Sequence, residues 1–281
     1  CLPRKRIYVP MASLSTGSPS QAIPDFFPVS PARFILSGAV VVTLIGVLVT
    51  TLRGGGSGWN AWLFLDQGLS HRSAHQIELI LVLVTMVFSV AGLLLRQWRW
   101  GACLMFPAFA FLLTEACLIA KTGGVGHAEW APAAHALRYG TPLALVLLAM
   151  KEPFGEAQVI MLLRVSLAFV FVTHGAEALM HYPRFIDLII GSGGNLLGWR
   201  VTESQATSLL TVIGWVDVVV GIAILIRPLP ALLWWMAVWG LVTALSRMTS
   251  LGWDAYRDVL IRATHFVVPF AMVWFRRKIE P

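Results

Sequence analysis

Charged residues are scarce in this chain of 281 amino acids. Asp, Glu, Lys and Arg make up 12% of it, while hydrophobic residues make up 57%. Soluble globular proteins have roughly 25% charged and about 45 to 50% apolar residues. The composition therefore excludes a soluble domain and predicts an integral membrane protein whose main partner is the lipid bilayer.

Cysteine is also scarce, and none of the three cysteines forms a Cys-x-x-Cys pair. Cys103 and Cys117 lie fourteen residues apart on one predicted helix, which is roughly 21 Å of helical rise. Disulfide geometry requires the two Cα atoms to be closer than about 7 Å. Thiol exchange within this chain is therefore excluded.

A concentrated basic patch is missing, although the net charge is +7. The Lys and Arg residues stand singly between apolar runs or gather at the chain ends, as in Arg276 to Lys278. This distribution fits contacts with anionic lipid headgroups. We expect no nucleic-acid partner.

Long apolar runs are what the sequence has in abundance. Eight of them come close to or reach the ~20 residues that a helix needs to cross a bilayer, and backbone groups in lipid must be hydrogen-bonded within such a helix. The expected spans are 34–52, 76–95, 101–120, 133–150, 157–180, 205–226, 229–248 and 257–275. The fold class predicted is an all-α membrane protein with eight transmembrane helices.

The Lys and Arg residues predict the orientation of these spans. Eight spans place both termini on one side, and twelve of the 21 Lys and Arg residues fall there. The positive-inside rule then places both termini in the cytoplasm. Residues 1–30 are predicted to be a mobile cytoplasmic tail, and the segments 53–75, 121–132, 181–204 and 249–256 to be outward loops.

The two halves of the chain resemble each other. ACLMFPAFAFLLTEA aligns with ALLWWMAVWGLVTAL, and HALRYGTPLALVLL aligns with VLIRATHFVVPFAM, which matches Arg138 with Arg262. Each unit has an even number of spans, so the two copies run in the same direction. We expect two parallel four-helix repeats, at 31–152 and 153–281.

Ionisable residues collect near the outward ends of the predicted spans. His174, Glu177 and His181 lie on nearly one side of the fifth span, because seven residues turn a helix by only about 20° from a whole number of turns. Asp258, Arg262 and His265 form a similar stripe on the eighth span. Charged groups inside a membrane normally face the protein interior or water, so these stripes predict a shared, outward-facing polar pocket.

The spans between them contribute further candidates. Trp235, Trp239, Thr243 and Arg247 form a four-residue-spaced stripe on the seventh span, and Asp217 lies near the middle of the sixth. We assign catalytic roles to His174, Glu177, Arg262 and His265, and cofactor binding to Asp217, Trp239 and Arg247. No metal ligands are assigned.

Structural alternatives remain for the same residues. Glu177 could form an ion pair with Arg247 or Arg262, and Arg262 could pair with Asp258. The His-x-x-Glu-x-x-x-His spacing could hold zinc, but it differs from the His-Glu-x-x-His arrangement of metalloproteases. His174 and His265 could also be axial haem ligands from two helices.

The proposed repeat distinguishes residues that both halves share from residues that only the second half has. The positions that align with His174, Glu177, Asp217, Arg247 and His265 in the first unit are Thr43, Gly46, Phe88, Leu118 and Thr141. Only the aligned arginines are shared. This favours a structural role for Arg138 and Arg262 and a specialised site in the second unit.

Two motifs stand out in residues 157 to 275. They are LLRVSLAFVFVTHGAEALMHYPRF, with an Arg at the start of a span and His-Gly at its end, and GWVDVVVGIAILIRPLPALLWWMAVWGLVTAL. In these motifs the chain resembles the DoxX family of membrane proteins. DoxX relatives are four-helix proteins, and the related DoxD branch is associated with thiosulfate:quinone oxidoreductase. The resemblance implies His174, Gly175, Glu177, Asp217 and Arg262 as the residues of interest.

These observations lead to a functional hypothesis. We expect a DoxX-like protein of the bacterial cytoplasmic (inner) membrane that acts as a quinone-linked redox subunit, together with other membrane redox subunits. The alternatives are a non-catalytic assembly subunit of a larger complex and a small-solute transporter. The transporter is disfavoured because no paired Gly or Pro breaks are evident at mid-depth in both halves.

Overall fold

The computed structural model describes residues 31–95, 98–124, 126–150 and 155–276. The predicted tail at 1–30 and the predicted boundary at 152/153 lie outside these residues. The described residues form helices and turns with no β-strand. Seven helices among them are long and apolar enough to cross a membrane, as expected of an all-α, multi-pass membrane protein.

The first half contains four long helical segments. They are α1 (Pro31–Leu52), α3 (His71–Leu94), α4 (Phe106–Thr122) and α6 (Ala136–Met150), with α5 (Ala131–Ala134) directly before α6. Short elements connect them: α2 (Gly58–Ala61), the π-helix η1 (Trp62–Asp66) and the 3₁₀-helices η2 (Arg99–Met105) and η3 (Ala128–Trp130). The predicted loop 53–75 is therefore largely helical.

The second half also contains four long helical segments, with a further helix between the first two. Its helices are α7 (Glu156–Leu179), α9 (Glu203–Ile226), α10 (Pro230–Leu251), α11 (Tyr256–Ile261) and α12 (Ala263–Arg276), with the 3₁₀-helix η4 (Trp253–Ala255) before α11. The added helix is α8 (Pro183–Leu197), which lies within the predicted loop 181–204. The predicted connection between the fifth and sixth spans is therefore largely helical.

The eighth expected span, 257–275, is not one continuous helix. The chain leaves the helical path at Arg262, where α11 ends and α12 begins, and only Ala263–Val273 counts as a shorter apolar helix. The fourth segment has a similar break at His135, between α5 and α6. Each break precedes a proline within the next helix by seven residues, Pro142 in α6 and Pro269 in α12. Because proline lacks a backbone N–H, the carbonyl groups of Arg138 and His265, four residues earlier, lose their usual helical partner just after each break.

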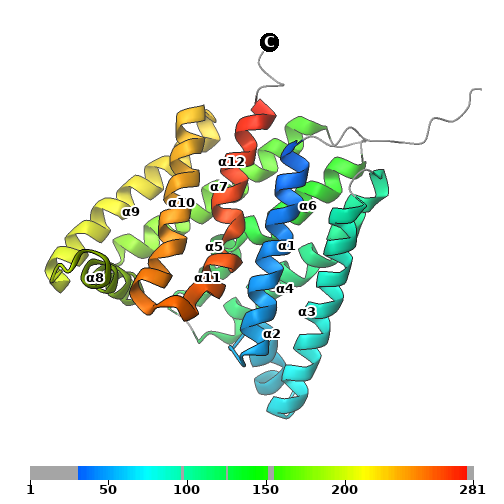
Figure 1. Ribbon diagram of the computed structural model, residues 1–281, viewed down its shortest axis with the longest axis horizontal. Coiled ribbons are helices and arrows are strands. Elements are labelled where there is room, and N and C mark those ends of the chain that lie inside the picture. The colour runs from blue at the N-terminus through cyan, green and yellow to red at the C-terminus, as the bar shows by residue number, and fades with distance from the viewer. Residues whose placement is uncertain (1–30, 96–97, 125, 151–154, 277–281) are drawn as a thin grey trace, which may run out of the picture.

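The long helices pack side by side, so that α1 begins and α12 ends on the same face of the molecule (Figure 1). We call this the terminal face, and the face that carries α2, α8 and α11 the opposite face. The helix α1 lies against α3 and against α11 and α12, while α7 lies against α9 and against α5 and α6. The first helix of each half thus contacts the last helices of the other half.

A close helix contact joins α7 to α9. A Cβ atom on Gly175 would lie 2.8 Å from the carbonyl oxygen of Gly214, and a Cβ on Gly214 would lie 2.8 Å from that of Gly175. Only glycine permits backbones to approach this closely. Leu163 and Leu167 of the same helix are fully buried in the core. This contact anchors the segment that ends in His174 and Glu177.

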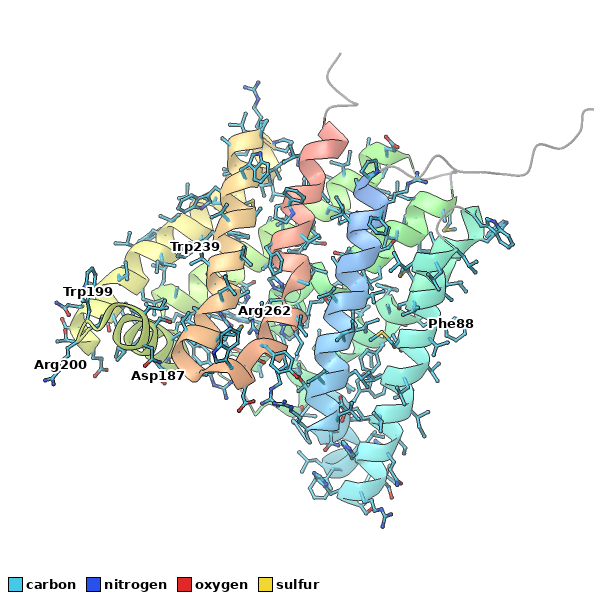
Figure 2. The ribbon with its side chains drawn as sticks, in the orientation of Figure 1. Phe88, Asp187, Trp199, Arg200, Trp239 and Arg262 are labelled. Atoms are coloured by element: carbon cyan, nitrogen blue, oxygen red, sulfur yellow. The ribbon has the colours of Figure 1, made fainter. Side chains whose placement is uncertain are left out.

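The helices α3 and α9 are built alike. Each has 24 residues and follows an N-cap hydroxyl, Ser70 or Thr202, that accepts a hydrogen bond from the backbone three residues on. Their buried residues occupy the same six positions, Ala74, Glu78, Val82, Thr85, Ser89 and Gly92 in α3 and Ala206, Leu210, Gly214, Asp217, Gly221 and Ile224 in α9. In this register Asp217 corresponds to Thr85. The sequence alignment had placed it on Phe88, which is exposed on the outer side of α3 (Figure 2).

Candidate functional site

The helices α9 and α10 contact each other over a short length only. The two helices are joined by a short turn at the terminal face and diverge towards the opposite face, where α8 lies across the gap (Figure 1). In the first half, α3 instead packs along α4 and η2. The divergence in the second half produces the space in which a site can form.

Hydrogen bonds to the end of α10 hold α8 in this position. Ser192 Oγ donates to the Ser246 carbonyl oxygen at 3.2 Å and lies 2.7 Å from Thr249 Oγ1. Asn195 Nδ2 donates to the carbonyl oxygens of Thr249 and Ser250 at 2.8 and 3.2 Å. The helix is amphipathic, with Phe185, Leu188, Ile189 and Leu196 turned towards the space it covers. It forms the floor of a cavity.

The cavity has a volume of about 410 Å³ and lies among α7, α8, α9, α10 and the junction of α11 with α12. Most of its wall is apolar. Six of the seven site residues predicted from the sequence lie on this wall, namely His174, Asp217, Trp239, Arg247, Arg262 and His265. Four helices and one helix break thus bring these side chains together.

The seventh predicted residue, Glu177, lies directly behind the wall. Its Oε2 is 2.8 Å from Nδ1 of His174, and the residue is buried. A carboxylate hydrogen-bonded to one imidazole nitrogen orients the ring and determines which nitrogen is available to a ligand. Glu177 thus leaves Nε2 of His174 available to the cavity. The expected ion pair of Glu177 with Arg247 or Arg262 is not formed in the described structure.

His265 lies next to His174, with ring centroids 6.2 Å apart. It is buried, and neither of its ring nitrogens makes a hydrogen bond to a described residue. A buried polar group without a partner destabilises a protein by about 1–3 kcal/mol. Such a group normally has water or a ligand as its partner.

Asp217 and Trp239 form a second polar pair at the middle of the membrane-spanning helices. The indole N–H of Trp239 faces the Asp217 carboxyl group between α9 and α10 as a potential hydrogen-bond donor. Asp217 Oδ1 and Trp239 Nε1 are both buried, and neither makes a hydrogen bond of good geometry to a described residue. Trp239 also stacks on Trp235, with centroids 6.0 Å apart. An acceptor and a donor therefore remain unsatisfied at this depth.

The two arginines of the wall are held by oxygens of their own segments. Arg247 Nη1 donates to the Thr243 carbonyl oxygen and, at 3.4 Å, to Ser246 Oγ. Arg262 Nη1 donates to the backbone oxygen of Asp258 at 3.0 Å. Neither guanidinium lies within 4 Å of a carboxylate of the described residues. The expected ion pair of Arg262 with the Asp258 side chain is therefore replaced by a backbone contact.

Two predicted neighbours lie outside the cavity. Nε2 of His181 is 2.9 Å from Thr211 Oγ1 on the exposed surface, because the chain turns out of the helical path after Leu179. Trp235 supports Trp239 from behind and is half-exposed. The stripes on the fifth and seventh spans are thus only partly directed to the site.

Sequence reasoning missed the contribution of α8. Ser192 and Phe185 line the cavity, and the Phe185 ring lies 6.1 Å from the His174 ring between centroids. The signal was the apolar periodicity of residues 183–197. It was overlooked because the segment is shorter than a membrane span and contains Gly191, Gly193 and Gly194.

The described part of the chain contains no group of three or more His, Cys, Asp or Glu side chains that could hold a metal ion. His174 and His265 lie close together, but no third ligand of these types joins them. Comparisons with protein families, with curated proteins and with solved structures find no match to this chain. The function must therefore be argued from the cavity itself.

Proposed function

We propose that this membrane protein binds a lipid-soluble quinone in the cavity and acts as a quinone-linked redox subunit. The observation that supports this most is the distribution of polarity within one cavity. Its wall is largely apolar, and its few polar groups include a donor and an acceptor that no described residue satisfies. Ligand pockets typically combine an apolar wall with a few such groups.

The residues at the mouth of the cavity are suited to a ligand that enters from the bilayer. Four residues both line the cavity and are strongly exposed, and all are apolar: Leu196 (65%), Trp199 (65%), Leu209 (50%) and Val242 (47%). Figure 2 shows Trp199 at the outer edge beside α8 and Arg262 towards the middle of the molecule. Leu209 and Val242 lie on membrane-spanning helices and face hydrocarbon, so a hydrophobic ligand can enter between α9 and α10 without crossing water.

The unsatisfied polar groups suit the two carbonyl oxygens of a quinone ring. The indole N–H of Trp239 and a ring N–H of His265 would each donate a hydrogen bond to a carbonyl oxygen. A bond to a ligand also relieves the unfavourable burial of these donors. The stacked pair Trp235 and Trp239 gives the site a flat, aromatic side.

Quinone chemistry also requires proton exchange, because reduction to the quinol takes up two electrons and two protons. His174 and Glu177 form a hydrogen-bonded pair between the cavity and the opposite face. Imidazole is the side chain best suited to pass protons near neutral pH. The electrons would be exchanged with a separate membrane redox subunit.

A quinone titration tests this proposal directly. The purified chain in lipid nanodiscs should show saturable quenching of tryptophan fluorescence by a short-chain ubiquinone or menaquinone analogue. Trp239→Phe should lose most of the saturable component. The matched control is Trp215→Phe on α9, since Trp215 is 60% exposed and does not line the cavity. Quenching that is linear in quinone concentration, or equal in both variants, would contradict the proposal.

The family and topology assignments are part of the same proposal. We infer that the chain is DoxX-like, lies in a bacterial inner membrane with cytoplasmic termini, and contains two parallel four-helix repeats with eight passes. The matching burial of α3 and α9 and the paired helix breaks support the repeat. These breaks match His135 with Arg262 and Arg138 with His265, a register three residues from the one that the sequence suggested.

The paired breaks also favour a second candidate, a small-solute transporter. The sequence showed no paired Gly or Pro breaks at mid-depth, but both halves have a helix interruption, at His135 and at Arg262. Many transporters bind their substrates where interrupted helices of two repeats meet. A transporter would expose the cavity alternately to both faces. In Ser246→Cys, with Cys1, Cys103 and Cys117 replaced by serine, a membrane-impermeant thiol reagent would then react from both sides, whereas a quinone-binding subunit would react from one side at most.

A further inference from the structure

The basic residues at the opposite-face end of the cavity are not explained by a neutral quinone. Arg247 on α10 and Arg262 at the α11/α12 break both line the cavity. Each guanidinium carries five N–H donors, and described residues accept one hydrogen bond from Arg262 and two from Arg247. Most of their donor capacity therefore remains available to a ligand.

The arginines at this end of the cavity have no close carboxylate partner among the described residues, although Glu115 lies within electrostatic reach of Arg138. Arg247 and Arg262 repel each other, and Arg138 adds a third guanidinium within electrostatic reach. The carboxylates of Asp258 and Glu177 also act on Arg262, but both lie beyond ion-pair distance, and Glu177 is hydrogen-bonded to His174. Positive charge in a low-dielectric site is stabilised by a close anion. The site is therefore suited to a negative charge that the described residues do not supply.

The rest of the cavity indicates which kind of ligand carries the negative charge. Phe185, Leu188 and Ile189 of α8 and Ile213 of α9 make the neighbouring wall apolar. A small hydrated anion would leave this wall in contact with water. A ligand with an anionic group at one end and a hydrocarbon chain at the other would satisfy both regions.

We propose that Arg247 and Arg262 bind the oxyanion group of an amphiphile, a carboxylate or phosphate, whose chain extends along the apolar wall to the mouth at Leu196 and Leu209. This inference uses the same cavity as the proposed function, but it concerns the charge of the ligand and not its redox chemistry. The oxyanion could come from a membrane amphiphile or from a free ion. The long apolar wall and the apolar mouth favour the amphiphile.

The test uses three probes on the full chain in nanodiscs of neutral phosphatidylcholine. They are oleate, oleyl alcohol with the same chain and no charge, and acetate with the charge and no chain. Binding is measured by native mass spectrometry and by displacement of a fluorescent fatty acid. Oleate should bind at least about tenfold more tightly than oleyl alcohol, because hydrogen bonds to charged groups contribute about 1.5–3 kcal/mol. Acetate should not displace oleate at the same concentration.

Two arginine variants test whether Arg247 and Arg262 cause the preference for the charged probe. Arg247→Gln and Arg262→Gln should each reduce the preference for oleate over oleyl alcohol severalfold, while Arg227→Gln should leave it unchanged. Arg227 is exposed at the terminal end of α9 and serves as the matched control. The comparison of probes on the unaltered chain remains decisive even if a variant does not fold.

Equal binding of oleate and oleyl alcohol would overturn the inference, and so would a preference that survives in both cavity variants. Acetate or inorganic phosphate that binds as tightly as oleate would show that the site takes a free ion, which also contradicts the amphiphile. Saturable quenching by quinone together with equal binding of oleate and oleyl alcohol would support the quinone proposal and reject the anionic amphiphile. A charge preference without quinone quenching would support this inference and reject the quinone.

Discussion

The two halves of the molecule use the same order of long helices, yet only the second half opens into the described cavity. In the first half α3 packs along α4 and η2, whereas in the second half α9 and α10 diverge and α8 enters between them. The position filled by Thr85 in α3 is filled by Asp217 in α9. A cavity can thus arise in a helical bundle when two neighbouring helices diverge and a short helix packs between their ends.

The largest expected effect comes from removing the imidazole that links the cavity to Glu177. His174→Ala should lower quinol-dependent absorbance change in purified membranes by about 100-fold or more, the usual contribution of a positioned proton-transfer group. The control in the first half is Thr43→Ala, because Thr43 is buried in α1 and its hydroxyl has no described partner. Equal activity of both variants would remove the functional distinction between the halves.

The next effect concerns the close packing of α7 on α9. Gly214→Val gives α9 the residue that α3 has at its corresponding position, Val82. Because a Cβ on Gly214 already lies 2.8 Å from the Gly175 oxygen, overpacking should lower the free energy of unfolding by about 1–3 kcal/mol.

Thermal unfolding in detergent checks this prediction. Gly38→Ala is the control, since a Cβ there meets open space in the described structure and alanine has the higher helix propensity. A Gly214→Val protein as stable as Gly38→Ala would show that α7 and α9 are not in close contact.

A third change exchanges the buried residues that differ between the halves. Asp217→Thr should raise stability by about 1 kcal/mol or more, since Asp217 Oδ1 is buried without a hydrogen bond to a described residue, and it should weaken ligand binding. Thr85→Asp should lower stability, because it buries a carboxyl group in the tightly packed half. Chemical denaturation measures both, and a loss of stability in Asp217→Thr would indicate a structural role for Asp217.

The smallest effect concerns the helix that only the second half contains. Asn195→Leu removes two hydrogen bonds from α8 to the end of α10. We expect faster amide hydrogen exchange in residues 183–197, equivalent to about 0.5–1.5 kcal/mol per bond lost. Ser208→Ala is the control, because Ser208 Oγ donates only to Ser204 within its own helix. Unchanged exchange would mean that α8 is held by its apolar face alone.

Much of this arrangement follows from sequence pattern. Apolar runs of ~20 residues predict the long helices, because lipid demands an internally bonded backbone. The helical spacing of His174 and Glu177 predicts that they share one side of their helix, and the high cost of charge in lipid predicts that Asp217, Arg247 and Arg262 turn inward. The structure places all of these on or directly behind one cavity wall.

The rest depends on tertiary contacts that a pattern does not contain. The α11/α12 break at Arg262 lies within a run that reads as continuous, and only the distant Pro269 hints at it. The helix α8 is stabilised by bonds to α10, not by its own glycine-rich sequence. The sequence aligns Asp217 with Phe88 through a few degenerate apolar residues, whereas the pattern of burial favours Thr85 as its counterpart.

The most direct test of the central claim is to find where a quinone contacts the chain. The protein in nanodiscs is irradiated with an azidoquinone, digested, and the labelled peptides are identified by mass spectrometry. We predict that the label attaches to cavity residues of α8, α9 and α10. Unmodified quinone should suppress this labelling, and Trp239→Phe should reduce it. Labels that fall mainly on α3 and α4, or that unmodified quinone does not suppress, would contradict this prediction.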